Sequence, residues 1–252
     1  IKLPSDVQSD SVYIKHCHIT NNVNEGIYIY GSSVTIENCT ISNNGSGISL
    51  NSWAEYPTPT ITVADCKIND NSSYGISAER INFSIENTEI ANNTGDHAFF
   101  WGPWQNNESL YMNGVQILNN DGNGIFASNF SNGLIELNNV QISNNSGMGI
   151  GTGFNNISID SSLISNNLDH GLNGFTNAEI SNTIIEGNMG SGIYGITNST
   201  LTNVVIRNNN NLNGSGGGIY YGYWYNNGDV ILEGASIYNN RATYGGGIDY
   251  SY

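Results

Sequence analysis

The chain has 252 residues, of which 21 are acidic and 6 are basic, so its formal net charge is −15 at pH 7. A surface with this charge repels nucleic acids and anionic membranes, so neither is expected as a partner. No apolar run is long enough to span a bilayer, so membrane insertion is not expected either.

Ten copies of one pattern follow each other along the chain. Each copy contains an apolar anchor residue, an asparagine three residues later, and a Gly-Ile or Gly-Leu pair after a short turn. Only the fourth copy differs, with His97-Ala98 at the place of that pair. The anchors are Ile19, Ile41, Ile68, Ile90, Ile117, Ile142, Ile164, Ile185, Ile206 and Ile237. Because they are 21 to 31 residues apart, the pattern predicts a solenoid that forms a single domain over residues 1–252.

Each copy predicts three short β-strands. Apolar residues alternate at the positions seven and five before the anchor, as in Val34 and Ile36 before Ile41, which is typical of a strand with one buried face. The residue two before the anchor and the anchor itself form a second strand, and the Gly-Ile pair opens a third. The sequence therefore predicts an all-β parallel solenoid of about ten coils, with three short strands in each coil.

The asparagine that follows each anchor is expected to be structural. Asparagine tolerates left-handed backbone at corners, and its amide can bond to the equivalent amides of the coils above and below. At a coil rise of about 4.8 Å, the stacked amides would form a continuous internal ladder. The ladder residues are Asn22, Asn44, Asn71, Asn93, Asn120, Asn145, Asn167, Asn188, Asn209 and Asn240.

The three cysteines occupy one position in three successive coils. Cys17, Cys39 and Cys66 each lie two residues before an anchor. Side chains at one position of stacked coils point the same way, and an odd count does not suit a disulfide framework. We therefore expect free thiols that act as small core residues.

The coil pattern, which covers about residues 12 to 250, resembles the right-handed parallel β-helices of the pectate-lyase-like superfamily. The last stretch, from Gly216-Gly217-Gly218-Ile219 to Gly245-Gly246-Gly247-Ile248, is similar to the polymorphic outer-membrane-protein repeats of bacterial adhesins. These resemblances imply a right-handed, single-stranded β-helix and a secreted, extracellular or cell-surface location. The chain begins without an initiator methionine and stops on Tyr252 directly after a repeat, so we expect a segment of a longer extracellular protein.

One side of the predicted solenoid is rich in aromatic residues. Five of the ten residues that follow the Gly-Ile positions, and are expected to point outward, are aromatic: Tyr28, Phe99, Phe126, Tyr194 and Tyr220. The loops that leave the same strands carry Trp53, Tyr56, Trp101, Trp104, Tyr223, Trp224 and Tyr225. Aromatic rings on a rigid scaffold stack on sugars or anchor protein interfaces, so this side is predicted to bind polysaccharide or a cell-surface ligand. The alternative is that the loops fold back and bury the rings.

Three carboxylates are predicted at outward positions of the first strand in consecutive coils: Glu136, Asp160 and Glu179. Acids placed in this way could bind Ca²⁺, or act as acid and base in glycoside hydrolysis. Their outward neighbours are Asn138, Ser158 and Ser181 rather than Lys or Arg, and the signature motifs of polygalacturonase-like enzymes are absent. A separate outward row is apolar and consists of Leu163, Ile184 and Val205.

Three functions are compatible with these features. The favoured one is a non-catalytic extracellular β-helix that binds polysaccharide or a surface through its aromatic side. The second is a structural spacer or filament subunit that associates end to end, because uncapped coils expose sheet edges. The third is a polysaccharide lyase or glycoside hydrolase that uses the three carboxylates. No nucleotide, haem or zinc motif is present, so no cofactor other than Ca²⁺ is considered.

Overall fold

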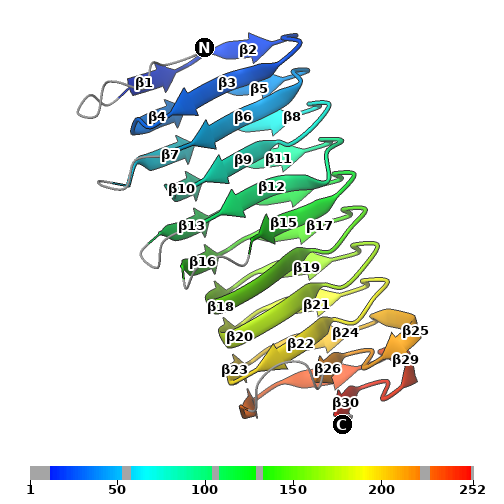
Figure 1. The fold of residues 1–252 in the computed structure, drawn as a ribbon. Coiled ribbons are helices and arrows are strands. Elements are labelled where there is room, and N and C mark those ends of the chain that lie inside the picture. The colour runs from blue at the N-terminus through cyan, green and yellow to red at the C-terminus, as the bar shows by residue number, and fades with distance from the viewer. Residues whose placement is uncertain (1–11, 53–57, 104–107, 129–132, 222–227, 251–252) are drawn as a thin grey trace.

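The computed structural model describes residues 12–52, 58–103, 108–128, 133–221 and 228–250. In these ranges the chain winds into ten coils that stack along one axis, and every regular element is a strand (Figure 1). All pairings between neighbouring coils are parallel, as for Ile41 with Ile68 and Ile68 with Ile90. The predicted all-β solenoid with three strands in each coil is confirmed.

The second strands of the coils form a separate ten-stranded sheet. Its members are β2 (His18–Thr20), β5 (Thr40–Ser42), β8 (Lys67–Asn69), β11 (Glu89–Ala91), β14 (Gln116–Leu118), β17 (Gln141–Ser143), β19 (Leu163–Ser165), β21 (Ile184–Glu186), β24 (Val205–Arg207) and β28 (Ser236–Tyr238).

The first and third strands belong to one 18-stranded sheet, because β18 (Ile150–Asp160) and β20 (Leu172–Ser181) each continue from the third strand of one coil into the first strand of the next. The other first strands are β1 (Val12–Lys15), β4 (Val34–Glu37), β7 (Thr60–Ala64), β10 (Asn82–Glu86), β13 (Ser109–Asn113), β16 (Leu134–Asn138), β23 (Ser199–Thr202) and β27 (Val230–Glu233). The other third strands are β3 (Glu25–Tyr30), β6 (Ser46–Asn51), β9 (Ile76–Glu79), β12 (His97–Gly102), β15 (Asn123–Ala127), β22 (Ile193–Thr197), β26 (Ile219–Tyr221) and β30 (Ile248–Tyr250). A small parallel pair, β25 (Asn210–Ser215) and β29 (Arg241–Tyr244), lies in the last two coils.

The asparagine ladder runs through the whole stack, as predicted. Nine hydrogen bonds of 2.8–3.2 Å join the amide nitrogen of each ladder residue to the amide oxygen of the next. Asn145 is fully buried, and its Oδ1 accepts from the backbone N and the Nδ2 of Asn120. Its Nδ2 donates to the carbonyl oxygen of Ile117 and to Oδ1 of Asn167. Each buried amide is therefore satisfied only when the coils on both sides are in register.

The left-handed corner residue is not the ladder asparagine, as the sequence suggested, but the residue before it. Asn43, Asn92 and Asn166, for example, each have a φ of 55°. The ladder residue itself has to direct its amide into the stack, so the turn is made one position earlier. Asparagine is favoured there because it adopts this backbone at little cost.

The glycine of each Gly-Ile pair is required by close packing against the next coil. A Cβ built on Gly149 would lie 2.7 Å from Cγ2 of Ile164 and 3.0 Å from Nδ2 of Asn167. These are the anchor and the ladder residue of the following coil, so the three recurring features of the sequence meet at one point. The repeated pattern thus describes one contact that is made again in each coil.

All three cysteines are free, as predicted, and Cys39 and Cys66 are buried while Cys17 is half-buried. Burial raises the pKa of the Cys39 thiol and raises that of Cys66 to about 11. The sulfur of Cys66 also accepts the backbone N–H of Cys39 at 3.4 Å, so the cysteines form a short second ladder. These thiols are therefore protonated core groups with low nucleophilicity.

Replacing Asn145 with Ala should lower the free energy of unfolding by roughly 3 kcal/mol, because buried donors and acceptors in both adjacent coils lose their partners. Urea denaturation measures this change. Asn22→Ala is the matched control, because Asn22 is the exposed end of the same ladder, and about 1 kcal/mol is expected for it. Equal losses for the two variants would contradict the stabilising role of the buried ladder.

Thiol alkylation at pH 8 should label Cys17 in the native protein and leave Cys39 and Cys66 unlabelled until the protein is unfolded. Burial keeps the latter two thiols away from the reagent and keeps them protonated. Peptide mapping after a timed reaction with iodoacetamide measures the labelling of each residue. Rapid native labelling of Cys66 would show that the coils open locally in this region.

Candidate functional site

The outward residues of the third strands form one continuous row along the solenoid, which we call the outer row. Backbone pairings place its ten members in register from coil to coil. They are Tyr28, Ser49, Ser77, Phe100, Phe126, Gly151, Asn173, Tyr194, Tyr220 and Asp249. Five of the ten are aromatic, so the predicted aromatic side exists.

The prediction for Phe99 and Trp101 is wrong, because both side chains are fully buried. The fourth coil has one extra residue before its third strand, so Ala98-Phe99 and not His97-Ala98 takes the place of Gly-Ile, and Phe99 pairs with Ile76 and Ile125. A shift of one residue exchanges the two faces of a strand. Trp101 then lies between Ala78 and Ala127 of the adjacent coils, whose small side chains leave room for its ring.

A first aromatic cluster joins the third to the fifth coils. Phe100 takes the outer-row place that was predicted for Phe99, and its ring centroid lies 6.2 Å from that of Phe126. His97 stacks on Phe126 at 4.5 Å with an angle of 8° between the ring planes, and Tyr74 lies 6.0 Å from His97. All four side chains are half-buried. Three of the four rings are nearly parallel, so they form a packed strip with exposed edges.

A second aromatic cluster joins the seventh to the ninth coils. Tyr194 stacks on Tyr220 at 4.8 Å and on His170 at 4.4 Å. These three side chains are also half-buried. Tyr28, in the first coil, is separated from the first cluster along the outer row by Ser49 and Ser77.

The two clusters are separated by Gly151 and Asn173, the outer-row residues of two successive coils. Gly151 leaves its place in the row without a side chain, and a Cβ there would lie 3.3 Å from Cδ2 of Phe126 and 3.2 Å from Sδ of Met148. The amide nitrogen of Asn173 donates to the same sulfur at 3.1 Å. We call this interval the gap. The polar group in the gap is the amide of Asn173, and its partner, the thioether of Met148, is a weak acceptor.

The histidines of the clusters are neutral groups. Burial lowers the pKa of both His97 and His170, and the nearby carboxylates of Asp96 and Asp169 only partly oppose this effect. Nδ1 of His170 accepts the backbone N–H of Ser191 at 2.8 Å, and Nδ1 of His97 lies 3.0 Å from the amide nitrogen of Asn123. In both neutral rings the proton is therefore on Nε2.

Sequence reasoning missed Tyr74, His97 and His170, which precede the Gly-Ile position instead of following it. Two-residue alternation does not identify them, because each lies three positions before the outer-row residue of its own coil. Six predicted ring residues lie outside the described part of the chain: Trp53, Tyr56, Trp104, Tyr223, Trp224 and Tyr225.

The three candidate carboxylates point outward on the first strands but do not converge. Glu136 and Glu179 belong to one row with Ser158 between them, whereas Asp160 lies in the neighbouring row. Asp160 accepts hydrogen bonds from Ser181, Ser161 and Asn182, which lower its pKa. Such a carboxylate stays ionised and is a poor general acid.

The three carboxylates that were considered for Ca²⁺ binding are not brought together by the structure. In the described ranges no three His, Cys, Asp or Glu side chains lie close enough to hold a metal ion. The reason is geometric, because Glu136 and Glu179 are two coil steps apart, which is about 9.6 Å at the usual strand spacing. A catalytic role for the three acids stays a prediction.

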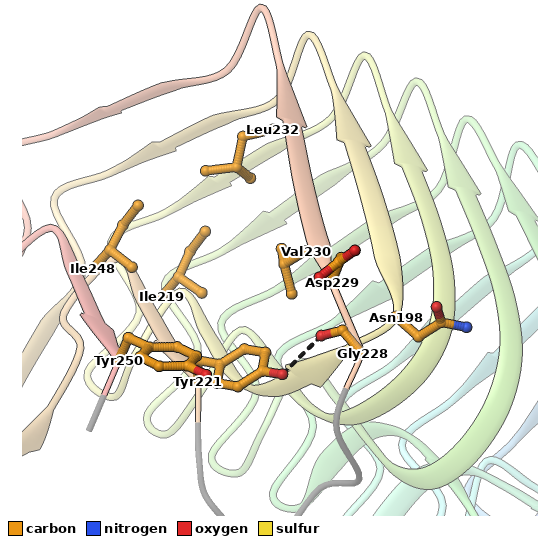
Figure 2. A pocket seen from close by; sticks show the side chains of 9 residues that line it. All are labelled: Asn198, Ile219, Tyr221, Gly228, Asp229, Val230, Leu232, Ile248 and Tyr250. Atoms are coloured by element: carbon orange, nitrogen blue, oxygen red, sulfur yellow. Dashed lines mark hydrogen bonds between the residues drawn. The ribbon is translucent and has the colours of Figure 1, made fainter. Parts of the chain in front are cut away.

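The outward apolar row of the ten-stranded sheet is present, with Leu163, Ile184 and Val205 in register and half-buried. A cavity of about 670 Å³ lies elsewhere, at the last coil, between β27 and β30 (Figure 2). There Leu232 and Ile248 are 38% and 49% exposed, although the equivalent residues of the previous coil are buried. The predicted end-to-end association would use this surface and stays a prediction.

The described part of the chain has no helix that could cross a membrane. The sequence model of the right-handed β-helix region family matches residues 6–94 and 104–252. No curated protein sequence matches this chain.

Among solved structures, the chain is similar to the A-module of the mannuronan C-5 epimerase AlgE4 from Azotobacter vinelandii, with 15% identity, a TM-score of 0.51 and coverage of 93% of this chain and 91% of that one. It is also similar to a variant of the periplasmic alginate epimerase AlgG, with 16% identity, a TM-score of 0.54 and coverage of 82% of this chain and 61% of that one. At these identities the likeness shows the fold alone.

Replacing both His97 and His170 with Gln should weaken the loss of stability between about pH 7 and pH 5. Because burial lowers the folded-state pKa of both rings, the unfolded chain takes up protons first as the pH falls below about 6.5. The contribution of the neutral rings to the free energy of unfolding is thus present above that pH and is lost as the pH falls through the folded-state pKa.

Urea denaturation at both pH values measures the effect on wild type and variant. The carboxylates with lowered pKa, such as Glu37 and Asp160, contribute only below about pH 4.5, so they do not interfere. The exposed His18, replaced by Gln, is the control and should leave the decline unchanged. An identical decline in the double variant and the wild type would contradict the buried, neutral state of the two rings.

Proposed function

The chain belongs to the right-handed β-helix family, and we propose that it binds polysaccharide, without catalysis, through the outer row and its two aromatic clusters. The observation that carries this proposal is that seven half-buried aromatic and histidine rings gather along a single face of a rigid stack. Partly exposed aromatic rings that gather on one face are typical of interaction sites.

The spacing of the outer row suits an extended polymer. Successive members repeat at the strand spacing of about 4.8 Å, so two coil steps cover about 9.6 Å, close to a two-sugar repeat of a β-linked glucan. A chain that lies along the solenoid axis can thus meet each ring cluster in the same way. The contacts on offer are ring edges, the outward ring surfaces beside the gap, and tyrosine hydroxyls.

The comparisons support the ligand class in a general way. The similar structures are named as mannuronan and alginate epimerases, which are proteins that act on polysaccharides. The same reasoning supports a location outside the cell or at its surface, where such polymers occur. The likeness of the triple-glycine stretches to adhesin repeats stays a prediction.

Substitution of the rings should separate binding from folding. Phe126→Ala, Tyr194→Ala and Tyr220→Ala are each expected to weaken polysaccharide retention by roughly tenfold, because each removes apolar contact area from the face. Co-sedimentation with insoluble polysaccharides and affinity electrophoresis with soluble ones measure retention. Each supernatant is assayed for released sugar, so that turnover is detected in the same experiment.

Tyr13→Ala is the matched control, because Tyr13 is 66% exposed on a first strand, away from the outer row. It should leave retention unchanged. Retention that survives all three ring substitutions would contradict the proposed face. Release of sugar would contradict the absence of catalysis and direct attention to the three carboxylates. No retention of any polymer would leave the structural spacer as the better account.

A further inference from the structure

We propose that the polysaccharide bound by this face is uncharged, and that the amide of Asn173 binds its hydroxyl groups at the gap between the two aromatic clusters. This inference rests on the proposed function and specifies its ligand. It differs from the ligand class that the names of the similar structures suggest, since mannuronan and alginate are polyuronates.

The charges on this side of the solenoid argue against a polyuronate. The third strands and the corners that lead into them carry seven carboxylates in the described ranges: Glu25, Asp70, Glu79, Asp96, Asp121, Asp169 and Asp249. No residue of the described third strands is Lys or Arg. A polymer with one carboxylate on each sugar would meet only like charges along this path, which lowers its affinity.

The basic residues of the described chain lie outside the outer row, and two of them are paired with carboxylates. Lys15 forms an ion pair with Glu37 on the first strands, and Arg207 forms one with Glu186 on the ten-stranded sheet. Lys67 is on β8, Arg241 is on β29, and Arg80 follows the end of β9. None of these positions is in the outer row, so none is placed to neutralise a carboxylate on each successive sugar.

Bridging by Ca²⁺ does not remove this difficulty. The described residues contain no group of three or more His, Cys, Asp or Glu side chains that could hold a metal ion. A calcium ion takes six to eight oxygen ligands, so a site organised by the protein needs several of its oxygens to converge. The outer row offers one carboxylate, that of Asp249 in the last coil.

The gap has the chemistry that suits a neutral sugar. Asn173 is half-buried, and its nitrogen donates to the sulfur of Met148, which is a weak acceptor. A sugar hydroxyl can replace this sulfur as a better partner, and the amide oxygen can accept from a second hydroxyl. Phe126 and Tyr194, one on each side of the gap, would contact the apolar parts of the sugar.

The experiment compares two polymer classes on the same protein. A neutral β-linked glucan and a neutral mannan are titrated beside polymannuronate and polygalacturonate, at low and moderate salt and with and without Ca²⁺. The expected result is that a neutral polymer binds at least roughly tenfold more tightly than either polyuronate. Any weak polyuronate binding should strengthen as salt screens the repulsion.

Three variants test the proposed role of Asn173 in binding. Asn173→Ala should weaken neutral-polymer binding about fivefold at an unchanged melting temperature, since the lost hydrogen bond to the sulfur is weak. Asn138→Ala, an exposed asparagine on a first strand, is the matched control and should have no effect. Asn173→Lys adds a cation to the face and should raise the affinity for polyuronate.

The outcomes separate this inference from the proposed function. Equal or tighter binding of polyuronate by the wild type, or no effect of Asn173→Ala, would overturn the inference and leave polysaccharide binding in place. No binding of either polymer class would overturn both. If Asn173→Ala lowers the melting temperature, Asn173→Lys in the polyuronate titration still decides the charge argument.

Discussion

The structure depends on the contact between each ladder asparagine and the coil that follows it. A buried amide has to find two donors and two acceptors, and for Asn145 these partners are backbone groups of the previous coil and the equivalent amides of the coils on both sides. The anchor isoleucine and the glycine of the Gly-Ile pair pack around the same point, and at Gly149, for example, no larger residue fits in place of the glycine. Since this contact recurs in each coil, coil length can vary between copies while the register of the strands stays fixed.

A fixed register turns each outward position into a row. Folding requires little of these side chains, so their identity is free to serve binding, and the outer row is the one in which aromatic residues collect. The fourth coil shows how strictly the register acts. Its extra residue moves Phe99 and Trp101 into the core, where Phe83 packs edge-on against Phe99, and brings Phe100 to the surface in their place.

Much of this could be predicted from the sequence, because a solenoid repeats one local rule. The strand pattern, the ladder and the free thiols of Cys39 and Cys66 follow from spacing alone. The burial of Phe99 could not be predicted while His97-Ala98 was treated as the substitute for Gly-Ile. A shift of one residue moves a side chain to the opposite face of a strand. The dispersal of Glu136, Asp160 and Glu179 could not be predicted without the strand register between coils. That register places Asp160 in a different row from Glu136 and Glu179. The histidines of the clusters depend on how far side chains reach between coils, which spacing does not report.

The arrangement of the aromatic clusters favours the proposed binding face over a bare scaffold. Stacked rings of adjacent coils, such as His97 with Phe126 and Tyr194 with Tyr220, contribute about 0.5–1.5 kcal/mol beyond their buried area. A scaffold selected only for stability would therefore gain by continuing the stack through all coils. Instead, the stack stops at Phe126, resumes at His170, and leaves Gly151 and Asn173 between them. The sixth coil contributes no ring to either cluster, and beside Gly151 lies the sulfur of Met148, to which the amide of Asn173 donates a weak hydrogen bond. A ligand with hydroxyl groups can compete with this sulfur for the amide, and the proposed binding would account for an interruption that the packing of the coils leaves unexplained.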